Sequence, residues 1–310
     1  MRQTLRIGTR GSQLALTQSR WVQARLQGQY PDLNVELVTI RTTGDRFLDA
    51  PLSTIGGKGV FVKEIEDALT AGRIDCAVHS MKDVPTELAP GLVIAAIPPR
   101  EVVHDALIGR TRVALRDLPR GARVGTSSLR RMALLRAQRR DLEIVALRGN
   151  VDTRLRKLTA GELDAVVLAA AGLRRLGIAC PEAEALDPED FIPAIGQGAL
   201  AVETRDDATR ALLAALDDAE TRLAVSAERA FLARVGGSCR TPLAAYATVE
   251  VGHLNLRALI AHPDGTEVVR GRKAGAADSA PDLGYELADE LLDRGGRRIL
   301  NGLDEAEHGR

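Results

Sequence analysis

Apolar residues along the chain recur with two different periods. Short runs rich in Val, Ile, Leu and Ala alternate with longer segments in which apolar residues return every three or four positions. This alternation is typical of an α/β fold with largely parallel strands. The first third of the chain predicts strands over 5–8, 35–39, 75–80 and 92–97, and helices over 12–27, with Ser12 near the N-cap, and 61–71.

A second series of the same kind begins near residue 99. It predicts strands over 106–108, 123–125, 143–146 and 165–169, and helices over 128–139 and 151–160. Residues 6–12 and 123–128 both place a Gly-Thr turn and a hydroxyl residue between a strand and a helix. Two interpretations stay open: common turn chemistry, or two similar lobes that face a common cleft.

The pattern changes in the last third. A strand over 199–203 and helices over 208–216 and 219–234 are followed by three strands and a helix, at 243–249, 254–261, 267–272 and 282–294. A Pro-Asp-Gly turn at 263–265 joins the last two strands. Successive strands joined by a tight turn favour an antiparallel sheet, so a separate small α+β domain is expected after a break near residue 217.

Composition indicates an ordinary globular protein. A chain of 310 residues is long enough for two or three domains. Its three cysteines are an odd number without C-x-x-C spacing, and its five histidines are scattered, which argues against disulfides and against a metal site. No apolar stretch approaches the ~20 residues of a membrane span, and no signal core is evident. We therefore expect a cytoplasmic protein that binds no membrane.

Charge is balanced overall, with 42 basic and 42 acidic residues, but unevenly distributed. Residues 120–160 hold ten Arg and one Lys against three acids, an excess of eight positive charges, whereas 181–190 holds five acids and no base. A solvated charged face explains such a run in most proteins. In a neutral protein, concentrated arginine also indicates a site for a specific polyanion rather than a coat for nucleic acid.

Two glycine-rich runs resemble nucleotide-binding motifs but do not meet their requirements. The run GQGALA at 196–201 opens a predicted strand, whereas a dinucleotide fingerprint follows a strand and opens a helix. The run GGKG at 56–59 lacks the spaced upstream glycine of a P-loop, and glycine follows its lysine. The long, glycine-rich connection over 41–59 is either disordered or a functional lid, and we interpret its GGKG run as a flexible loop in which Lys58 contacts an anion.

Two other segments present reactive side chains. Ser80, Lys82 and Asp83 follow a buried strand, where α/β proteins place ligand-handling groups, although a Lys-Asp pair at a strand end is commonly turn chemistry. Cys239 follows Gly-Gly-Ser in a loop after a helix, which is compatible with a reactive thiol. Cys76 lies within a predicted strand and is expected to be a small buried hydrophobe.

Six blocks of sequence resemble the porphobilinogen deaminases over essentially the full length of the chain. The blocks are IGTR with Ser12 (7–12), GGKGVFVKE (56–64), HSMKDVP (79–85), GTSSLRR (125–131), LRGNV with Thr153 and Arg154 (147–154) and PAIGQG (193–198). The resemblance implies two lobes like those of type II solute-binding proteins with a central cleft, and a small C-terminal α+β domain. The implied domains are residues 1–98 with 195–217, residues 99–194, and residues 218–310.

The resemblance also implies a reaction. Four porphobilinogen molecules condense head to tail, with release of ammonia, into the linear tetrapyrrole hydroxymethylbilane. The growing chain is built on a dipyrromethane cofactor bound through a thioether to Cys239. Asp83 is the implied catalytic residue, where a carboxylate can stabilise developing positive charge and move protons. Asp45 and Phe61 are the implied lid residues, and no metal is needed.

The arginines then have a physical purpose, because every pyrrole carries an acetate and a propionate. Guanidinium groups pair bidentately with carboxylates and stay charged. The resemblance assigns cofactor and substrate binding to thirteen residues: Arg10, Ser12, Lys58, Ser80, Lys82, Thr126, Ser128, Arg130, Arg131, Arg148, Arg154, Arg175 and Gln197. Arg116, Arg120, Arg136, Arg139 and Arg140 are expected at the surface.

Two positions depart from the commoner family pattern: Ser238 replaces a glycine and Thr54 replaces a lysine. Neither change removes a reacting group. The resemblance favours a monomer. Two other functions remain alternatives: a two-lobed solute-binding or effector-sensing module for a small carboxylate, and a nucleic-acid-binding protein, which would lose affinity steeply with salt.

Overall fold

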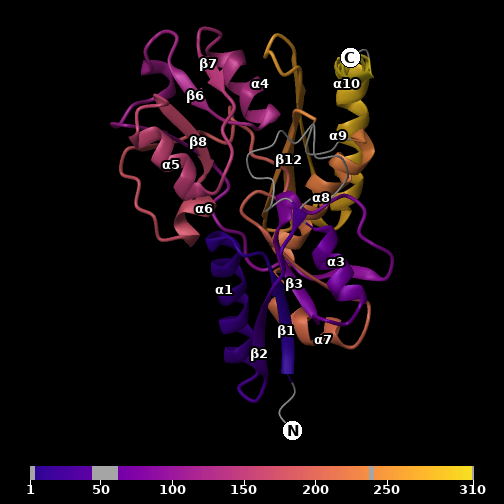
Figure 1. Ribbon diagram of the computed structural model, residues 1–310. Helices are drawn as coiled ribbons and strands as arrows, with labels where there is room; N and C mark the ends of the chain where they lie inside the picture. The colour runs from indigo at the N-terminus through magenta and orange to yellow at the C-terminus, as the bar shows by residue number, and fades with distance from the viewer. Residues whose placement is uncertain (1–3, 44–61, 237–240, 309–310) are drawn as a thin grey trace. The chain divides into compact units, whose positions relative to one another are not determined.

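The computed structural model describes residues 4–43, 62–236 and 241–308 (Figure 1). The chain divides into two compact units. Unit 1 comprises Met1–Glu101, Arg174–Ile178 and Gly198–Arg222, and unit 2 comprises Val102–Leu173, Ala179–Gln197 and Leu223–Arg310.

Unit 1 is built on a five-stranded sheet in the order β2-β1-β3-β10-β4. Strand β1 is parallel to β2 and β3, whereas β10 is antiparallel to β3 and β4. The strands span Thr4–Thr9 (β1), Asn34–Thr39 (β2), Cys76–Ser80 (β3), Leu92–Ala96 (β4) and Leu200–Arg205 (β10). The chain therefore returns to this sheet after more than a hundred residues, as the strand predicted near Ala199 requires.

Helices cover both faces of this sheet. Helix α1 (Gln13–Gln29) contributes Val22 and Leu26 to one core, which also receives residues from α7 (Thr209–Leu213) and the 3₁₀ turn Ala214–Leu216. Helix α3 (Lys63–Thr70) contributes Ile65 and Leu69 to a second core with Ile74, Ala77 and Leu92. Burial on both faces explains the nearly continuous apolar runs of these strands.

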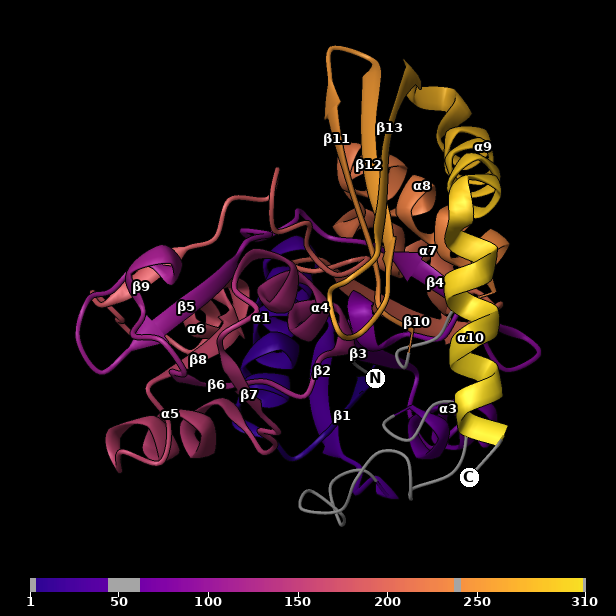
Figure 2. The same cartoon turned by 90° about the horizontal axis from the view of Figure 1, so that it is seen from above.

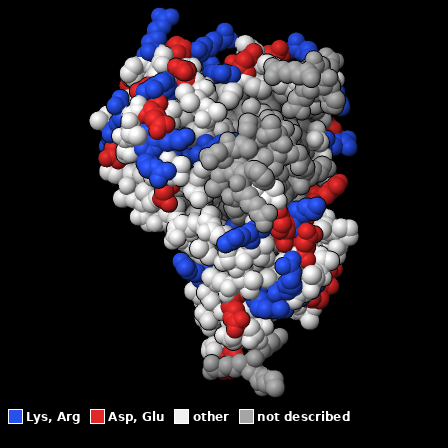
Figure 3. Space-filling view, viewed as in Figure 1, with Lys and Arg blue, Asp and Glu red and all other residues white. Residues whose placement is uncertain are grey.

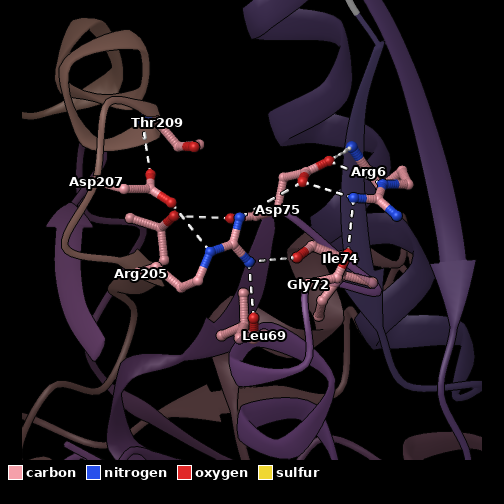
Figure 4. Close-up of polar contacts among 9 residues, drawn as sticks. Arg6, Leu69, Gly72, Ile74, Asp75, Arg205, Asp207 and Thr209 are labelled. Atoms are coloured by element: carbon pink, nitrogen blue, oxygen red, sulfur yellow. Dashed lines mark hydrogen bonds and ion pairs between the residues drawn. The ribbon is translucent and has the colours of Figure 1, made fainter. Parts of the chain in front are cut away.

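An ion-pair network joins Arg6 of β1 and Arg205 of β10 to Asp75, the residue directly before β3 (Figure 4). The Asp75 carboxylate accepts hydrogen bonds from the Arg6 backbone N–H at 2.8 Å and from the Arg6 guanidinium at 2.9 and 3.0 Å. Arg205 donates to the carbonyl oxygens of Leu69 and Ile74 at 2.7 and 2.8 Å. Burial alone would raise the pKa of Asp75, but its hydrogen bonds from Arg6 and the charges of Arg6 and Arg205 hold that pKa below its ordinary value.

The substitution Asp75→Asn is expected to lower the free energy of unfolding by about 1–2 kcal/mol near neutral pH, because it removes a charge-assisted hydrogen-bond acceptor. Since the folded-state pKa is lowered, this contribution is complete above the unfolded pKa of about 3.9 and disappears as pH falls through the folded value. Urea unfolding of both proteins at several pH values measures it. A difference that persists unchanged at the lowest pH would contradict the assignment, and Asp206→Asn, in an exposed pair with Arg210, is the matched control.

Unit 2 contains a second five-stranded sheet in the order β7-β6-β8-β5-β9. The strands span Asp105–Gly109 (β5), Arg123–Gly125 (β6), Glu143–Val145 (β7), Ala165–Ala169 (β8) and Ala183–Ala185 (β9). Its associated helices are α4 (Leu129–Gln138), α5 (Val151–Thr159) and the first part of α6 (Ala170–Arg175), whose last two residues belong to unit 1. Strands β7, β6 and β8 are parallel, and β5 is antiparallel to both of its neighbours.

Both five-stranded sheets follow one topology. In each sheet three neighbouring strands are parallel, and the one that comes first along the chain lies between the other two. An antiparallel strand, β10 or β5, then separates this group from the edge strand β4 or β9. The shared topology confirms that the Gly-Thr turns after β1 and β6 belong to two similar α/β lobes. The expectation of largely parallel strands is confirmed, because in each sheet a single strand, β10 or β5, runs against all the others.

Unit 2 also contains the antiparallel sheet β11-β12-β13, formed by Leu243–Glu250, His253–Ala261 and Val268–Ala276. Figure 2 shows these strands side by side, with α9 (Ala280–Leu291) along them. Helices α8 (Ala219–Val235) and α9 pack on Leu254, Leu256 and Ile260, whereas Leu259 joins the core of the second lobe. The predicted small α+β fold is therefore present.

Several predicted boundaries differ from the structure. Helix α6 and strand β9 were not expected, because α6 follows β8 without a boundary signal and β9 has only three residues in an acidic stretch. The helix predicted over 282–294 corresponds to α9 and the start of a π-helical segment, Leu292–Gly296, in which Gly295 has a φ of 120° that favours glycine. A further helix, α10 (Arg297–His308), follows it. The helix predicted over 208–216 ends in a 3₁₀ turn.

No helix of the described residues is long and apolar enough to cross a membrane. On the face drawn in Figure 3, Lys and Arg side chains lie intermixed with Asp and Glu side chains. This is the pattern of an ordinary solvated surface.

Candidate functional site

A short 3₁₀ helix places Asp83 at the end of β3. Residues Met81–Asp83 form one turn directly after the strand. The buried Met81 side chain anchors this turn, and the Met81 N–H donates to the Ala199 carbonyl oxygen at 3.0 Å. Asp83 is exposed and Lys82 is half-buried. The local sequence therefore fixes the backbone while leaving the carboxylate accessible to a bound molecule.

The turn between β1 and α1 supplies the next functional groups. Ser12 is the N-cap of α1, and its Oγ accepts a hydrogen bond from the Ala15 N–H at 3.3 Å. This satisfies one of the unpaired donors at the helix start. One helical turn and a half further, Gln18 donates through Nε2 to Ser80 Oγ at 3.0 Å. Helix α1 is thus tied to the end of β3.

These groups line one pocket within unit 1. It brings together four of the predicted site residues, Arg10, Ser12, Ser80 and Asp83. The remaining lining residues are Leu14, Ala15, Gln18, Val62, Val78 and His79. The pocket thus offers a guanidinium group, a carboxylate and hydroxyl groups beside an apolar wall. Such a set suits a small molecule that carries both an anionic and a cationic group.

A buried pair lies beside this pocket. His79 Nε2 is 2.9 Å from Glu203 Oε2, and both side chains are almost fully buried. His79 belongs to β3 and Glu203 to β10, so their contact ties the strand that leads to Asp83 to its neighbour. Near them, burial and the charge of Glu203 raise the pKa of Glu66. Sequence reasoning did not single out Gln18, His79 or Glu203, because only the fold brings them to the pocket.

Arg175, also in unit 1, is half-buried, and its guanidinium donates to the Gly198 carbonyl oxygen at 2.7 Å. Burial lowers the pKa of Arg175, and the charge of Glu101 opposes this change. Arg175 does not line the pocket that contains Asp83.

A second group of predicted residues gathers in unit 2 at the start of α4. Thr126 Oγ1 accepts from the Ser128 N–H at 3.2 Å, and Ser128, the N-cap of α4, accepts from the Arg131 N–H at 3.4 Å. Both hydroxyl groups therefore hold the turn after β6 in the helix-starting conformation. Arg130 follows Ser128 by two residues, on the first turn of the same helix.

Arg130, Arg131 and Gln197 converge on Asp105, which sequence reasoning missed. Asp105 Oδ1 accepts from Arg131 Nη2 at 2.7 Å and from Gln197 Nε2 at 3.0 Å, and Oδ2 lies 2.8 Å from Arg130 Nη1. Burial alone would raise the pKa of Asp105, but the two guanidinium charges hold it well below its ordinary value. The only signal in the sequence is an acid directly before a predicted strand.

Arg148 and Arg154 lie at the start of α5, and both are half-buried. Arg154 donates through Nε to the Gly149 carbonyl oxygen at 2.8 Å. Gly149 has a φ of 102°, and a Cβ there would meet Thr153 at 2.9 Å, so glycine is required at this turn. Four candidates, Asp45, Lys58, Phe61 and Cys239, lie outside the described residues.

Of the arginines expected at the surface, Arg139 does more than face solvent. It donates to the carbonyl oxygens of Leu115, Arg116 and Leu118 and pairs with Asp141. The side chain therefore ties α4 to the segment before β6, which corrects that expectation. Arg136 similarly donates to the Pro263 carbonyl oxygen at 3.3 Å.

Residues 4–43, 62–236 and 241–308 contain no group of three or more His, Cys, Asp or Glu side chains that could hold a metal ion. Two cysteines of the described chain are free thiols: Cys76, which is buried as expected, and Cys180, which is half-buried.

Comparison with known proteins gives a consistent result along the chain. Residues 5–212 match the family described as "Porphobilinogen deaminase, dipyromethane cofactor binding domain", and residues 222–293 match "Porphobilinogen deaminase, C-terminal domain". The porphobilinogen deaminase of Roseiflexus sp. is 54% identical over 97% of this chain and 100% of its own length. That of Syntrophobacter fumaroxidans is 53% identical over 96% of both chains.

Among solved structures, the periplasmic aliphatic sulphonate binding protein SsuA from Escherichia coli aligns with 74% of this chain and 70% of its own. Its TM-score is 0.40 and its sequence identity 17%.

Proposed function

The chain belongs to the porphobilinogen deaminase family, and from this premise we propose how its own residues carry out the reaction. The protein is a transferase that joins porphobilinogen units, with release of ammonia, into the linear tetrapyrrole hydroxymethylbilane. Its cofactor is a dipyrromethane. The observation that carries the residue assignments is the pocket of unit 1, which combines Asp83 with Arg10, Ser12 and Ser80.

The chemistry of this pocket matches the substrate. Porphobilinogen carries two carboxylates and an aminomethyl group, so a site for it needs an anion-binding group and an acceptor for positive charge. Arg10 and the hydroxyl groups of Ser12 and Ser80 supply the first, and the accessible carboxylate of Asp83 supplies the second. In this proposal Lys82, next to Asp83 in the same turn, adds a further positive charge for the carboxylates.

Asp83 is the proposed catalytic residue. When ammonia leaves the aminomethyl group, positive charge develops on the pyrrole, and a carboxylate hydrogen-bonded to the pyrrole N–H stabilises that charge. The same carboxylate can accept the proton that the attacking α-carbon loses once its new bond to the methylene carbon has formed. The fixed turn Met81–Asp83 fits this role, because a preorganised group needs no rearrangement as the charge forms.

The dipyrromethane, when bound, supplies the free α-carbon to which porphobilinogen units are joined. We propose that Cys239 anchors it through a thioether and that arginine side chains hold its carboxylates. The residues present fit such a group: Arg130 is buried, and its Nε is without a hydrogen-bond partner among the described residues. An anionic ligand would satisfy a donor of this kind. The other proposed holders are Thr126, Ser128, Arg131, Arg148, Arg154, Arg175, Gln197 and Lys58.

The direct test of the function is stoichiometric. Purified protein incubated with porphobilinogen is expected to release one ammonia for each porphobilinogen consumed and to form one linear tetrapyrrole from four. A protein that binds porphobilinogen without releasing ammonia would instead be a binding module for a small carboxylate.

The Arg148→Leu variant tests whether the arginines hold the pyrrole chain. Arg148 is half-buried near the start of α5 and is proposed to pair with carboxylates. Its loss is therefore expected either to lower the fraction of molecules that carry the dipyrromethane by roughly tenfold or to stop chain growth before the tetrapyrrole. Mass spectrometry of the protein during turnover measures both. Arg116→Leu is the control, since Arg116 is 88% exposed beside Asp117. An unchanged product profile would return Arg148 to a role in surface charge.

The proposal also covers the domains, the lid, the oligomeric state and the location of the protein. We propose the three domains predicted from the sequence, with Asp45 and Phe61 acting in a lid, in a monomeric cytoplasmic protein that binds neither nucleic acid nor membranes. The return of β10 to the first sheet supports a first domain made of two chain segments. The free thiols of Cys76 and Cys180 are compatible with a reducing compartment.

A further inference from the structure

Asp105 is a buried carboxylate of unit 2 with several charged and polar partners among the described residues. It is the first residue of β5, and its side chain is fully buried. Arg131 donates to Asp105 Oδ1 through both Nε and Nη2, at 3.1 and 2.7 Å. Arg131 Nη1 also donates to the Val167 carbonyl oxygen at 2.8 Å. The plane of the Arg131 guanidinium is thereby fixed.

Arg130 is held from the other side of the same carboxylate. Its Nη1 lies 2.8 Å from Asp105 Oδ2 and donates to the Ile192 carbonyl oxygen at 2.9 Å. Its guanidinium lies 5.8 Å from the centroid of the Phe191 ring. Arg130 is 4% exposed, and its Nε is without a hydrogen-bond partner within the described chain.

The charges of this network do not cancel. Two guanidinium groups, on Arg130 and Arg131, share one carboxylate, so the buried cluster carries one excess positive charge. An uncompensated buried charge is costly unless a partner of opposite sign approaches it. The cluster is therefore better suited to hold an anionic ligand than to stabilise the fold alone.

Gln197 connects the same carboxylate to a glycine-rich turn. Its Nε2 donates to Asp105 Oδ1 at 3.0 Å and to the Val103 carbonyl oxygen at 2.7 Å. Gly196, the preceding residue, has a φ of 71° and donates its N–H to the buried Glu228 at 2.7 Å. Three residues proposed to bind the pyrrole chain thus depend on one acidic side chain that is not itself proposed to touch it.

We propose that Asp105 is the positioning residue of the carboxylate-binding site in unit 2: it orients the guanidinium groups of Arg130 and Arg131 toward the acetate and propionate groups of the pyrrole chain. The proposal rests on the proposed function and deepens it. Asp105 acts through the arginines, so its removal should change binding and cofactor assembly rather than the proton transfer assigned to Asp83.

The test uses Asp105→Asn, which keeps the shape of the side chain and removes its charge. The expected result is a folded protein in which the dipyrromethane-carrying fraction falls, or the KM for porphobilinogen rises, by about tenfold or more, because misdirected binding groups lose most of their effect. The kcat of the molecules that do carry the cofactor should change much less. A folded variant with a full cofactor complement and a KM within about twofold of the wild type overturns the proposal.

Asp164→Asn is the matched control. Asp164 is also a carboxylate between two arginines of unit 2, 3.5 Å from Arg110 and 3.6 Å from Arg123. Neither arginine is proposed to bind the pyrrole chain. This variant should show a lower melting temperature with an unchanged cofactor fraction and KM. An equal loss of binding in both variants would mean that general destabilisation explains the effect, and would also overturn the proposal.

A double variant separates positioning from charge balance. Asp105→Asn combined with Arg131→Gln has the same net charge in the network as the wild type. If Asp105 acts through the arginines, adding Asp105→Asn should reduce kcat/KM by a smaller factor in the Arg131→Gln background than in the wild type. Equal factors overturn the proposal. If Asp105→Asn alone does not fold, the double variant is compared with Arg131→Gln instead. The double variant should bind the cofactor less well, because Arg130 has also lost its partner. Equal cofactor binding by these two variants overturns the proposal.

Failure of this inference can be told from failure of the proposed function. A wild-type protein that neither carries two linked pyrroles nor releases ammonia from porphobilinogen would refute the function. A wild-type protein that does both, with an equally competent Asp105→Asn variant, would refute only the inference.

Discussion

The Asp83→Asn substitution is expected to lower kcat by roughly a hundredfold or more, the loss seen when one preorganised electrostatic partner of a transition state is removed. Asparagine has the size of aspartate, but it cannot balance the positive charge that develops as ammonia leaves, and it cannot accept the proton of the attacking α-carbon. Asp83 is exposed at the end of a short 3₁₀ helix, so the change should cost little stability.

The same variant should still carry the dipyrromethane. Each protein molecule needs to assemble its dipyrromethane only once, whereas turnover must be repeated. A slow variant therefore still has time to acquire the cofactor. The measurement compares kcat and intact mass of the wild type, Asp83→Asn and the control Asp117→Asn, whose carboxylate is 62% exposed beside Arg116. Near-normal turnover by Asp83→Asn would remove Asp83 from the catalytic role.

Replacing Cys239 by serine is expected to abolish activity completely, because a hydroxyl group is a far weaker nucleophile than a thiolate and cannot form the thioether. The variant should show the mass of the unmodified chain under conditions in which the wild type gains two linked pyrroles. Cys180→Ser and Cys76→Ser are the controls, since both residues are free thiols, one half-buried and one buried. A Cys239→Ser protein that keeps the adduct would place the attachment elsewhere.

Local sequence signals predicted most of the fold correctly. Ser12 was expected near a helix start, and the structure has it as the N-cap of α1 with its Oγ bonded to the Ala15 N–H. The Pro-Asp-Gly turn before β13 was expected from turn chemistry, and β12 and β13 pair across it. Such features depend on residues within a few positions of one another, and these determine local backbone conformation.

Features set by distant pairing were not predictable in the same way. Strand β9 has only three residues, and it exists because it pairs with β5, more than seventy residues earlier. The antiparallel entry of β10 between β3 and β4 likewise depends on where the chain returns, which apolar periodicity does not encode.

In the candidate site, too, residues with a local sequence signal were identified and a residue set by distant contacts was not. Arg130, Arg131 and Gln197 were identified through motif resemblance, but their shared partner Asp105 was not, because a single acid before a strand has no distinctive local pattern. Asp105 lies 26 residues from Arg131 and 92 from Gln197. The resemblance could therefore name candidate ligand-binding residues, but not the buried carboxylate that they contact.

If this chain builds tetrapyrroles on a dipyrromethane bound to Cys239, the intact mass of the denatured wild-type protein must show it. We expect a gain that matches two linked pyrroles, located on the peptide that contains Cys239. An unmodified mass that persists after incubation with porphobilinogen would mean that Cys239 carries no dipyrromethane.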